Sequence, residues 1–498
     1  MTFLDYLWHD LANNLASYLG QRRWFGGKGR PLQNVRLADV AWLRSPPHGL
    51  ALAIVACQYA DGPPEFYLMP LGFILGERPS QILPDAIIMP RLQTLSGPAV
   101  VYDALSEAAT CTFLLDLMKL KVPLPAQIGQ IIVQPTPIFP TLRGSSSQPL
   151  TVHPNSKDQS NRCIRYDHQG QGRIMLKLFS KLEPGINPDY EMAMFLSEHS
   201  TFANMAPLAG AISYMAYGTE TTLAIVQGYE PNTGSAWDLA QTNLNQLFEK
   251  SKTIKGEPSD DDLEKSVSEI TGWAQLLGQR TGEMHVALAS SNQVPEFKPE
   301  LVTYHDIAHL AASLTQKTEA VKTDWENLKA QDIFRNKLTD VTKTLKLGQK
   351  IRCHGDYHLD QVLCKNDDFV IIDFEGEPAC SLAERRAKQS PLKDVAGMVR
   401  SFDYAASIFI RNITAEGLRR GMEPWARTWQ DAVTGNFLAG YVSAVASANL
   451  LPEDEATYNA LLWLYTLDKA LYELRYESMH RPDWVDIPRQ SVKLMLGG

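Results

Sequence analysis

The stretch that decides the fold of this chain spans residues 351–378 and reads IRCHGDYHLDQVLCKNDDFVIIDFEGEP. Asp356 and Gln361 stand five residues apart, and a short apolar run leads from them to Asp373. After Trp237 the apolar residues recur at helical spacing, and this stretch is the one strand-like interruption. Before Trp237 the chain is richer in short strand-like runs, such as 50–59, 65–71, 174–179 and 222–226. The pattern predicts an α+β protein with a mainly helical second half.

The polar residues of this stretch suit phosphoryl transfer to a hydroxyl group. That reaction needs one carboxylate that orients the hydroxyl, and oxygen ligands that hold Mg²⁺ on the nucleotide phosphates. Kinase catalytic loops supply these groups as Asp-x-x-x-x-Asn followed by an Asp at a strand end. Here Gln361 takes the place of the asparagine. We therefore predict that Asp356 is catalytic and that Gln361, Asp373 and Glu375 are the metal ligands.

A lysine for the nucleotide phosphates is also present. Lys177 stands between apolar neighbours in the strand-like run 174–179, which is unusual for a lysine without a partner. Asn187 and Pro188 are typical of a helix start, so Glu191 falls in the first turn of the following helix. We predict that Glu191 holds Lys177. The alternative is a strand-edge lysine with a solvated glutamate.

The loop that covers the phosphates is less clearly marked. The chain has no G-x-G-x-x-G ahead of Lys177, and Gly170 and Gly172 lie too close to its strand. Ser160 and Asn161 offer backbone N–H groups and small polar side chains. We therefore predict that these two residues contribute to nucleotide binding.

Composition excludes several classes of protein. The 498 residues are 44% hydrophobic and carry 47 Lys and Arg against 56 Asp and Glu, a net charge of −9. A binder of nucleic acid would be basic, so we expect no nucleic-acid partner. The six cysteines form no C-x-x-C pair, and the N-terminus lacks a basic signal-peptide region. No apolar run is long enough for a membrane span, so we expect a cytoplasmic protein.

A candidate acceptor site lies on the predicted helix 461–478. Asp468, Tyr472, Arg475 and Tyr476 fall at i, i+4, i+7 and i+8, on one helix face. Sugar sites pair aromatic faces with polar side chains, because sugar rings have apolar faces and polar rims. We predict that these four residues contact the acceptor. The alternative is an aromatic stripe packed in the core.

The motifs together resemble the maltokinases, which are relatives of the aminoglycoside phosphotransferases with a eukaryotic-kinase-like fold. The resemblance covers most of the chain and is carried by these blocks: Gln21–Arg30 (QRRWFGGKGR), Lys177–Phe179, Pro184–Asp189, His354–Leu359, Asp373–Pro378, Ser390–Met398 (SPLKDVAGM) and Arg481–Trp484. The last three blocks are far more specific than a generic kinase loop.

The resemblance implies a bilobal protein-kinase-like fold of the α+β class. It implies a mixed α/β cap domain over residues 1–95, an intermediate segment and β-rich N-lobe over 96–230, and a mainly helical C-lobe over 231–498. The implied reaction is ATP- and Mg²⁺-dependent phosphorylation of the anomeric hydroxyl of maltose, giving maltose 1-phosphate for α-glucan (glycogen) synthesis. Trehalose synthase is the implied protein partner. In one departure, Asp360 stands where the family has glycine, beside Gln361.

Two other functions remain open. One is a kinase of a related acceptor such as glucosamine, because the catalytic motif is shared and only the acceptor pocket discriminates. The other is a pseudokinase that binds glucan or a glucan-making enzyme without catalysis. The presence of Lys177, Asp356, Gln361 and Asp373 together argues against the second.

Three structural roles are also expected. We expect Asp394 to brace the catalytic loop or cap a helix, and His354 to tie backbone carbonyls. We expect the acidic run Asp260, Asp261 and Asp262 to lie in a solvated loop.

Overall fold

The computed structural model describes residues 3–45, 48–76, 84–94, 97–120, 122–145, 149–154, 161–253, 258–320, 333, 336–338, 341 and 346–496. The chain divides into two compact units. The first comprises residues 1–194 and 206–231, and the second comprises residues 195–205 and 232–498. The boundary runs through helix α4 (Pro188–His199), and each unit is described by itself.

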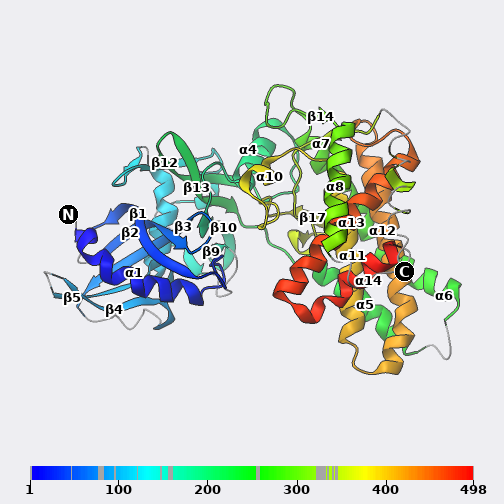
Figure 1. Ribbon diagram of the computed structural model, residues 1–498, viewed down its shortest axis with the longest axis horizontal. Coiled ribbons are helices and arrows are strands. Elements are labelled where there is room, and N and C mark those ends of the chain that lie inside the picture. Colours follow the sequence, from blue (N-terminus) through cyan, green and yellow to red (C-terminus); the bar gives the residue numbers. More distant parts are fainter. Residues whose placement is uncertain are drawn as a thin grey trace. The chain divides into compact units, whose positions relative to one another are not determined.

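The first unit is built on two antiparallel sheets (Figure 1). The N-terminal sheet has the strand order β1-β2-β3-β5-β4, and β11 pairs with β3. Strands β2 and β3 are buried almost throughout, because they are central in the sheet and their sequences are nearly all apolar. The elements of this part are α1 (Phe3–Gln21), β1 (Leu32–Arg44), β2 (His48–Tyr59), β3 (Glu65–Leu75), β4 (Ile87–Thr94), β5 (Gly97–Asp103) and β11 (Lys181–Leu182).

The other sheet of this unit has the order β6-β7-β12-β13-β10-β9-β8. Strand β10 lies between β13 and β9, so Lys177 sits in the sheet interior, opposite Ile225 and Cys163. The elements are α2 (Ala108–Asp116), β6 (Leu124–Pro125), β7 (Gln130–Pro135), α3 (Phe139–Arg143), β8 (Thr151–Pro154), β9 (Arg162–His168), β10 (Gln171–Leu178), β12 (Leu208–Ala216) and β13 (Thr219–Gly228).

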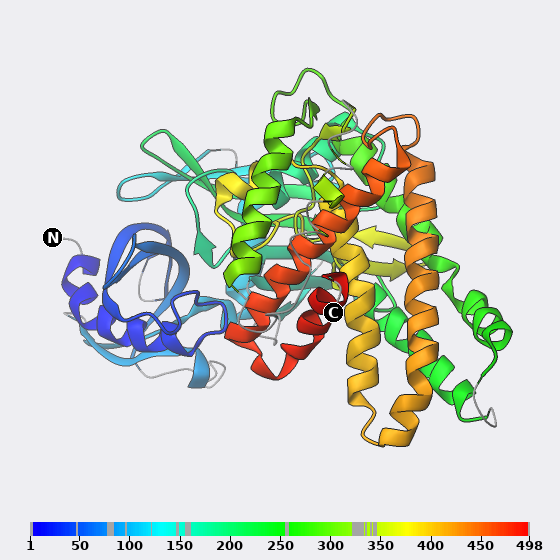
Figure 2. The same ribbon diagram turned by 45° about the vertical axis from the view of Figure 1, so that its right-hand side comes forward.

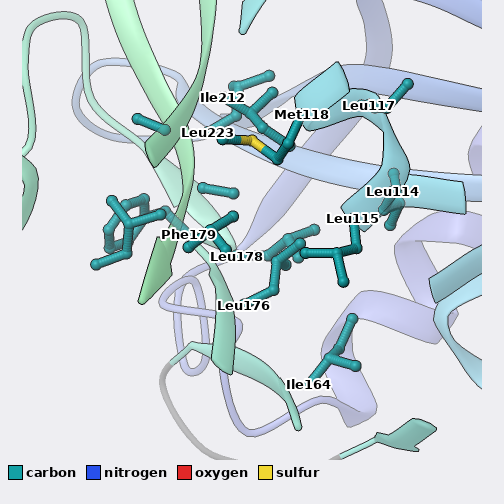
Figure 3. Packing of buried hydrophobic residues seen from close by; sticks show 14 of the residues in the cluster. Leu114, Leu115, Leu117, Met118, Ile164, Leu176, Leu178, Phe179, Ile212 and Leu223 are labelled. Carbon is teal, nitrogen blue, oxygen red and sulfur yellow. The ribbon is translucent and has the colours of Figure 1, made fainter. Parts of the chain in front are cut away.

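One apolar core fills the space between this sheet and α2. Figure 3 shows side chains from α2 and the turn after it meeting side chains from β9, β10, β12 and β13 and from the residue that follows β10. The labelled residues are Leu114, Leu115, Leu117, Met118, Ile164, Leu176, Leu178, Phe179, Ile212 and Leu223. The same cluster includes Ala41, Leu52 and Ile54 of the N-terminal sheet. The two sheets therefore share a core, and hydrophobic burial holds them together.

The second unit is mainly helical. In Figure 2 the long helices α11 (yellow) and α12 (orange) run side by side, and α13 (red-orange) packs on α11. The short hairpin β16–β17 and a second two-stranded sheet, in which β14 pairs with the sequence-distant β15, complete the unit. The elements are α5 (Ala236–Ser251), α6 (Asp260–Thr271), α7 (Trp273–Leu288), β14 (Glu300–Leu301), α8 (Tyr304–Ala320), β15 (Gln349–Lys350), β16 (Val362–Lys365), β17 (Asp368–Ile371), α10 (Leu382–Arg386), α11 (Leu392–Asn412), α12 (Glu416–Val445), α13 (Glu455–His480) and α14 (Asp486–Met495).

The α+β prediction is confirmed, and one local expectation is wrong. We expected Asp260, Asp261 and Asp262 to belong to a solvated loop, but they form the first turn of α6. Ser259 caps this helix by accepting the backbone N–H of Asp262. Three carboxylates at a helix N-terminus are favourable there, because the N-terminal end of the helix dipole is positive. Among the described helices, none combines the length and apolar character that a membrane span requires.

Candidate active site

The loop that carries Asp356 is fixed by the buried carboxylate of Asp394, in the first turn of α11. Asp394 Oδ2 accepts the backbone N–H of His354 at 2.7 Å, and its Oδ1 accepts that of Gly355 at 2.9 Å. Gly355 has a φ of 87°, which a side chain would disfavour. Asp394 is only 1% exposed. The expectation that Asp394 braces this loop is confirmed.

Two histidines complete the support of the loop. His285 on α7 places Nε2 at 3.0 Å from Asp394, and its Nδ1 lies 3.0 Å from the hydroxyl of Tyr441. Burial raises the pKa of Asp394, but the hydrogen bond and charge of His285 lower it, and the net pKa lies below the usual range. His354 is fully buried and its Nε2 lies 2.9 Å from the carbonyl of Ile372. It ties the loop to the backbone beside Asp373, as expected.

Asp356 itself is paired with a lysine that the sequence pattern did not single out. Lys469 on α13 donates to Asp356 Oδ1 at 3.1 Å and to Glu377 Oε1 at 2.7 Å. Burial raises the pKa of Asp356, whereas the charges of Lys469 and His358 lower it, and the net pKa lies below the usual range. The carboxylate of Asp356 is therefore ionised at neutral pH and can accept a proton or a hydrogen bond from a hydroxyl.

The structure brings two predicted metal ligands together. Gln361 ends the short turn η5 (Leu359–Gln361), and Asp373 follows β17, so the β16–β17 hairpin joins them. Gln361 Nε2 lies 3.1 Å from Asp373 Oδ2. Asp373 adopts a φ of 68°, a left-handed conformation that is costly for a non-glycine residue and often marks functional sites. Carboxylate and amide oxygens are ligands that Mg²⁺ takes, so the residues fit this ion.

A small cavity of about 40 Å³ lies beside the catalytic loop. Gly355 and Tyr357, the neighbours of Asp356, line it together with residues from helices α8, α11 and α13. The further lining residues are Lys317, Glu377, Lys393, Gly397, Tyr465, Asp468, Lys469 and Tyr472. Asp468 pairs there with Lys317 at 2.6 Å. This volume accommodates a few water-sized groups rather than a whole sugar ring.

The four predicted acceptor residues separate along α13. Asp468 and Tyr472 line the cavity, whereas Arg475 and Tyr476 lie on the exposed surface further along the helix. The ring of Tyr476 stacks on Tyr472 at 6.3 Å and on His480 at 4.5 Å between centroids. The structure thus brings two of the four to the catalytic loop. Acceptor contact stays a prediction for all four.

In the first unit, Lys177 forms an ion pair with Asp189 at 2.8 Å. Both side chains are largely buried, at 11% and 1% exposure. Asp189 is fixed because its backbone N–H donates to Asn187 Oδ1 at the start of α4. Glu191 lies in the same helix turn, and its contact with Lys177 stays a prediction. Among the predicted nucleotide-binding residues, Asn161 is half-buried at the start of β9, and Ser160 lies outside the described residues.

Sequence reasoning missed three residues of these sites: Asp189, Glu377 and Lys469. The local signal for Lys469 was weaker than that for Lys177, because Lys469 has the apolar Ala470 on one side but Asp468 on the other. Asp360, which departs from the maltokinase pattern, accepts from the hydroxyl of Ser235 at 3.2 Å. That contact directs its carboxylate toward the start of α5.

Comparison with known families agrees with this geometry. Residues 151–427, more than half of the chain, match the phosphotransferase enzyme family. Residues 18–106 match the maltokinase N-terminal cap domain. The cap match begins and ends at other residues than the predicted domain 1–95, whose boundary stays a prediction.

Several similar proteins are glucosamine kinases. One from Streptacidiphilus jiangxiensis is 25% identical over 348 residues, which cover 68% of this chain and 72% of that protein. One from Mycolicibacterium smegmatis is 30% identical over 146 residues, or 29% of this chain and 34% of that protein. A crystal structure of a glucosamine kinase superposes with a TM-score of 0.62 at 18% identity, covering 97% of this chain and 99% of that one. A complex of a glucosamine kinase with glucosamine, ADP and phosphate gives a TM-score of 0.56 at 18% identity, over 96% and 98% of the two chains.

The two family matches and these superpositions confirm the bilobal kinase-like fold with an N-terminal cap. Phosphotransferases of this kind use a nucleoside triphosphate as phosphoryl donor. The chain belongs to the phosphotransferase enzyme family and carries a maltokinase-type cap domain.

Proposed function

We propose that this protein transfers the γ-phosphoryl group of ATP to the anomeric hydroxyl of maltose, giving maltose 1-phosphate. The cap domain supports this acceptor, because its family description names maltokinases. The ion pairs of Glu377 with Lys469 and of Asp468 with Lys317 support a neutral acceptor independently. A trehalose synthase partner and a role in α-glucan synthesis stay predictions.

Asp356 is the proposed acceptor of the hydroxyl proton. Because its pKa is held low, Asp356 is ionised at neutral pH and orients the hydroxyl oxygen toward the γ-phosphorus. Lys177, held by Asp189 at 2.8 Å, would hold the nucleotide phosphates. Mg²⁺ bound by Gln361 and Asp373, with Glu375 as an additional ligand, would supply positive charge at those phosphates.

The choice of a neutral acceptor rests on one observation: each carboxylate that lines the cavity is already paired with a lysine. Glu377 is paired with Lys469 and Asp468 is paired with Lys317. An ammonium group on an acceptor would need a carboxylate of its own, because burying an unpaired charge is costly. Both carboxylates that line the cavity already have a lysine. A neutral sugar hydroxyl fits this environment better than an amine does.

Glucosamine is the second candidate acceptor. It is favoured by the relatives, since the similar curated proteins and solved structures are glucosamine kinases. Against it stand the lysines of the cavity. The cap region does not separate the two acceptors by its fold, because the glucosamine kinase structure superposes over 97% of this chain. Phosphorylation of either sugar would use Asp356 in the same way. The two proposals differ only in which residues around the acceptor select the sugar.

An acceptor panel tests the proposal directly. ADP release is measured with ATP and Mg²⁺ on maltose, glucosamine, glucose and kanamycin, and NMR locates the phosphate on any product. We expect turnover on maltose with the phosphate at C1. Turnover on glucosamine alone would keep the kinase and refute maltose. Asp356→Asn is the matched variant: it keeps the shape of the side chain and should lower kcat by at least about 100-fold, with little change in nucleotide affinity.

A further inference from the structure

We propose that Lys469 is a specificity-determining residue that excludes amino sugars. Its ammonium group occupies the position between Asp356 and Glu377 where the ammonium of a glucosamine-type acceptor would bind. This inference rests on the proposed function and concerns the same site. It also gives Lys469 a role that differs from those of the catalytic carboxylate and the metal ligands.

The contacts of Lys469 are those that a bound ammonium ligand would make. Nζ lies 3.1 Å from Asp356 Oδ1, 2.7 Å from Glu377 Oε1 and 4.8 Å from the centroid of the Tyr472 ring. Two carboxylates and one aromatic face around a cation form a typical recognition site for amines. Lys469 fills this site from within the chain.

The lysine is held in place by its helix. The flanking residues Leu467 and Ala470 are fully buried, so α13 cannot rotate to withdraw Lys469 without exposing apolar surface. The side chain itself is only 16% exposed. Burial lowers the pKa of Lys469, but Asp356 and Glu377 raise it more, so the net shift is upward and the side chain is charged at neutral pH.

An amino sugar would therefore have to share the two carboxylates with a charge of the same sign. Like charges that close together are mutually destabilising, and displacing Lys469 would leave its ammonium buried without a partner. A hydroxyl, in contrast, needs only a lone pair of Asp356, which keeps other lone pairs after bonding Lys469. Lys469 therefore creates selectivity by weakening the binding of amino sugars, not by strengthening the binding of maltose.

The test is a series of three substitutions at one position. Lys469→Ala removes the charge and opens space beside both carboxylates, Lys469→Met removes the charge but keeps the volume, and Lys469→Arg keeps the charge. The readout is the ratio of kcat/KM for glucosamine to kcat/KM for maltose. We expect this ratio to rise by at least about tenfold in Lys469→Ala and to stay within about twofold of wild type in Lys469→Arg. Lys469→Met should raise the ratio less than Lys469→Ala does, because it removes the charge repulsion but opens no space for the amine.

A folded, active Lys469→Ala variant with an unchanged ratio would overturn the proposal. So would an equal rise in Lys469→Arg, because the effect would then not depend on charge. If Lys469→Ala does not fold, the wild-type protein still tests the idea by competition. Glucosamine should inhibit maltose phosphorylation at least about tenfold more weakly than glucose does. Inhibition as strong as that by glucose would contradict the exclusion of amines.

A measurement without turnover separates this inference from the proposed function. Methylammonium chloride should raise the melting temperature of Lys469→Ala by about 2 °C relative to equal NaCl, and should leave Lys469→Met unchanged. That result would support the ammonium site even if maltose were not the acceptor. No difference between the two salts for Lys469→Ala would refute the site even if maltose were phosphorylated.

Discussion

Replacing Asp394 by asparagine should loosen the catalytic loop without touching Asp356. In the wild type, Oδ2 accepts the His354 N–H and faces His285 Nε2, while Oδ1 accepts the Gly355 N–H. An asparagine whose oxygen takes the Oδ2 position places its NH₂ group at the Oδ1 position, where it faces the Gly355 N–H. One charge-assisted hydrogen bond is lost and one buried donor is left unsatisfied.

The expected cost follows from these two losses. A charge-assisted bond contributes about 1.5–3 kcal/mol, and an unsatisfied buried donor costs about 1–3 kcal/mol. Together they lower the local opening free energy of the loop by about 2.5–6 kcal/mol. At about 1.4 kcal/mol per factor of ten, amide exchange in the loop should become at least about 60-fold faster.

Hydrogen exchange read by mass spectrometry on peptides that contain residues 351–358 is the appropriate assay. A single unfolding free energy is not well defined for a chain with two compact units, whereas exchange reports the loop itself. Asp431→Asn, on an exposed position of α12, is the matched control and should leave the same peptides unchanged. Exchange that accelerates less than tenfold in Asp394→Asn would refute the view that this carboxylate fixes the loop.

Four further outcomes are expected. Lys177→Met should raise the dissociation constant for ATP at least about tenfold, because it removes the ammonium group that Asp189 holds. Isothermal titration measures this constant, and an unchanged value would exclude Lys177 from the nucleotide site. Asp39→Ala should lower the local opening free energy of the first unit by about 3 kcal/mol, as read by hydrogen exchange, because four hydrogen bonds to the carboxylate, from three backbone N–H groups and a tyrosine hydroxyl, are lost. The charges of Lys469 and His358 outweigh burial and lower the pKa of Asp356, so this group is ionised throughout the neutral range and kcat/KM should show no acid limb from it between about pH 5 and 8. Lys469→Met removes a charge that lowers this pKa and should move the acid limb to higher pH, as a pH–rate profile would show.

The features that sequence analysis predicted are those that depend on near neighbours in the chain. Asn187 and Pro188 mark the start of α4 because capping and the fixed φ of proline act within a few residues. The spacing of Gln361 and Asp373 also predicts their proximity, because a single hairpin of near neighbours in the chain joins them, and Asp356 lies only five residues before Gln361. The error at Asp260–Asp262 shows the limit of this reasoning. Charge composition indicated solvent exposure correctly, but it could not distinguish a loop from the first turn of a helix.

The pairings that involve distant parts of the chain were harder to predict. Lys469 is 113 residues from Asp356, and no local periodicity relates α13 to the catalytic loop. Within α13, the pattern pointed to a polar and aromatic face, of which Asp468 and Tyr472 line the cavity, but the residue that contacts Asp356 is Lys469, the immediate neighbour of Asp468. A shift of one residue on a helix turns a side chain by about 100°, so the register of packing decides which residue reaches the site. That register is set by tertiary packing on α11.

The lysines around the cavity link the fold to the choice of acceptor. A family of kinases can keep one catalytic loop and change its acceptor by changing the helix that faces the loop, because phosphoryl transfer depends mainly on positioning and electrostatics. In this chain α13 presents Lys469 to Asp356, and α8 presents Lys317 to Asp468 of α13. Each lysine neutralises a carboxylate that would otherwise attract an amine. The selectivity predicted for this enzyme therefore comes from charge pairs formed before the acceptor arrives, and it should be lost when the pair nearest the reacting hydroxyl is opened.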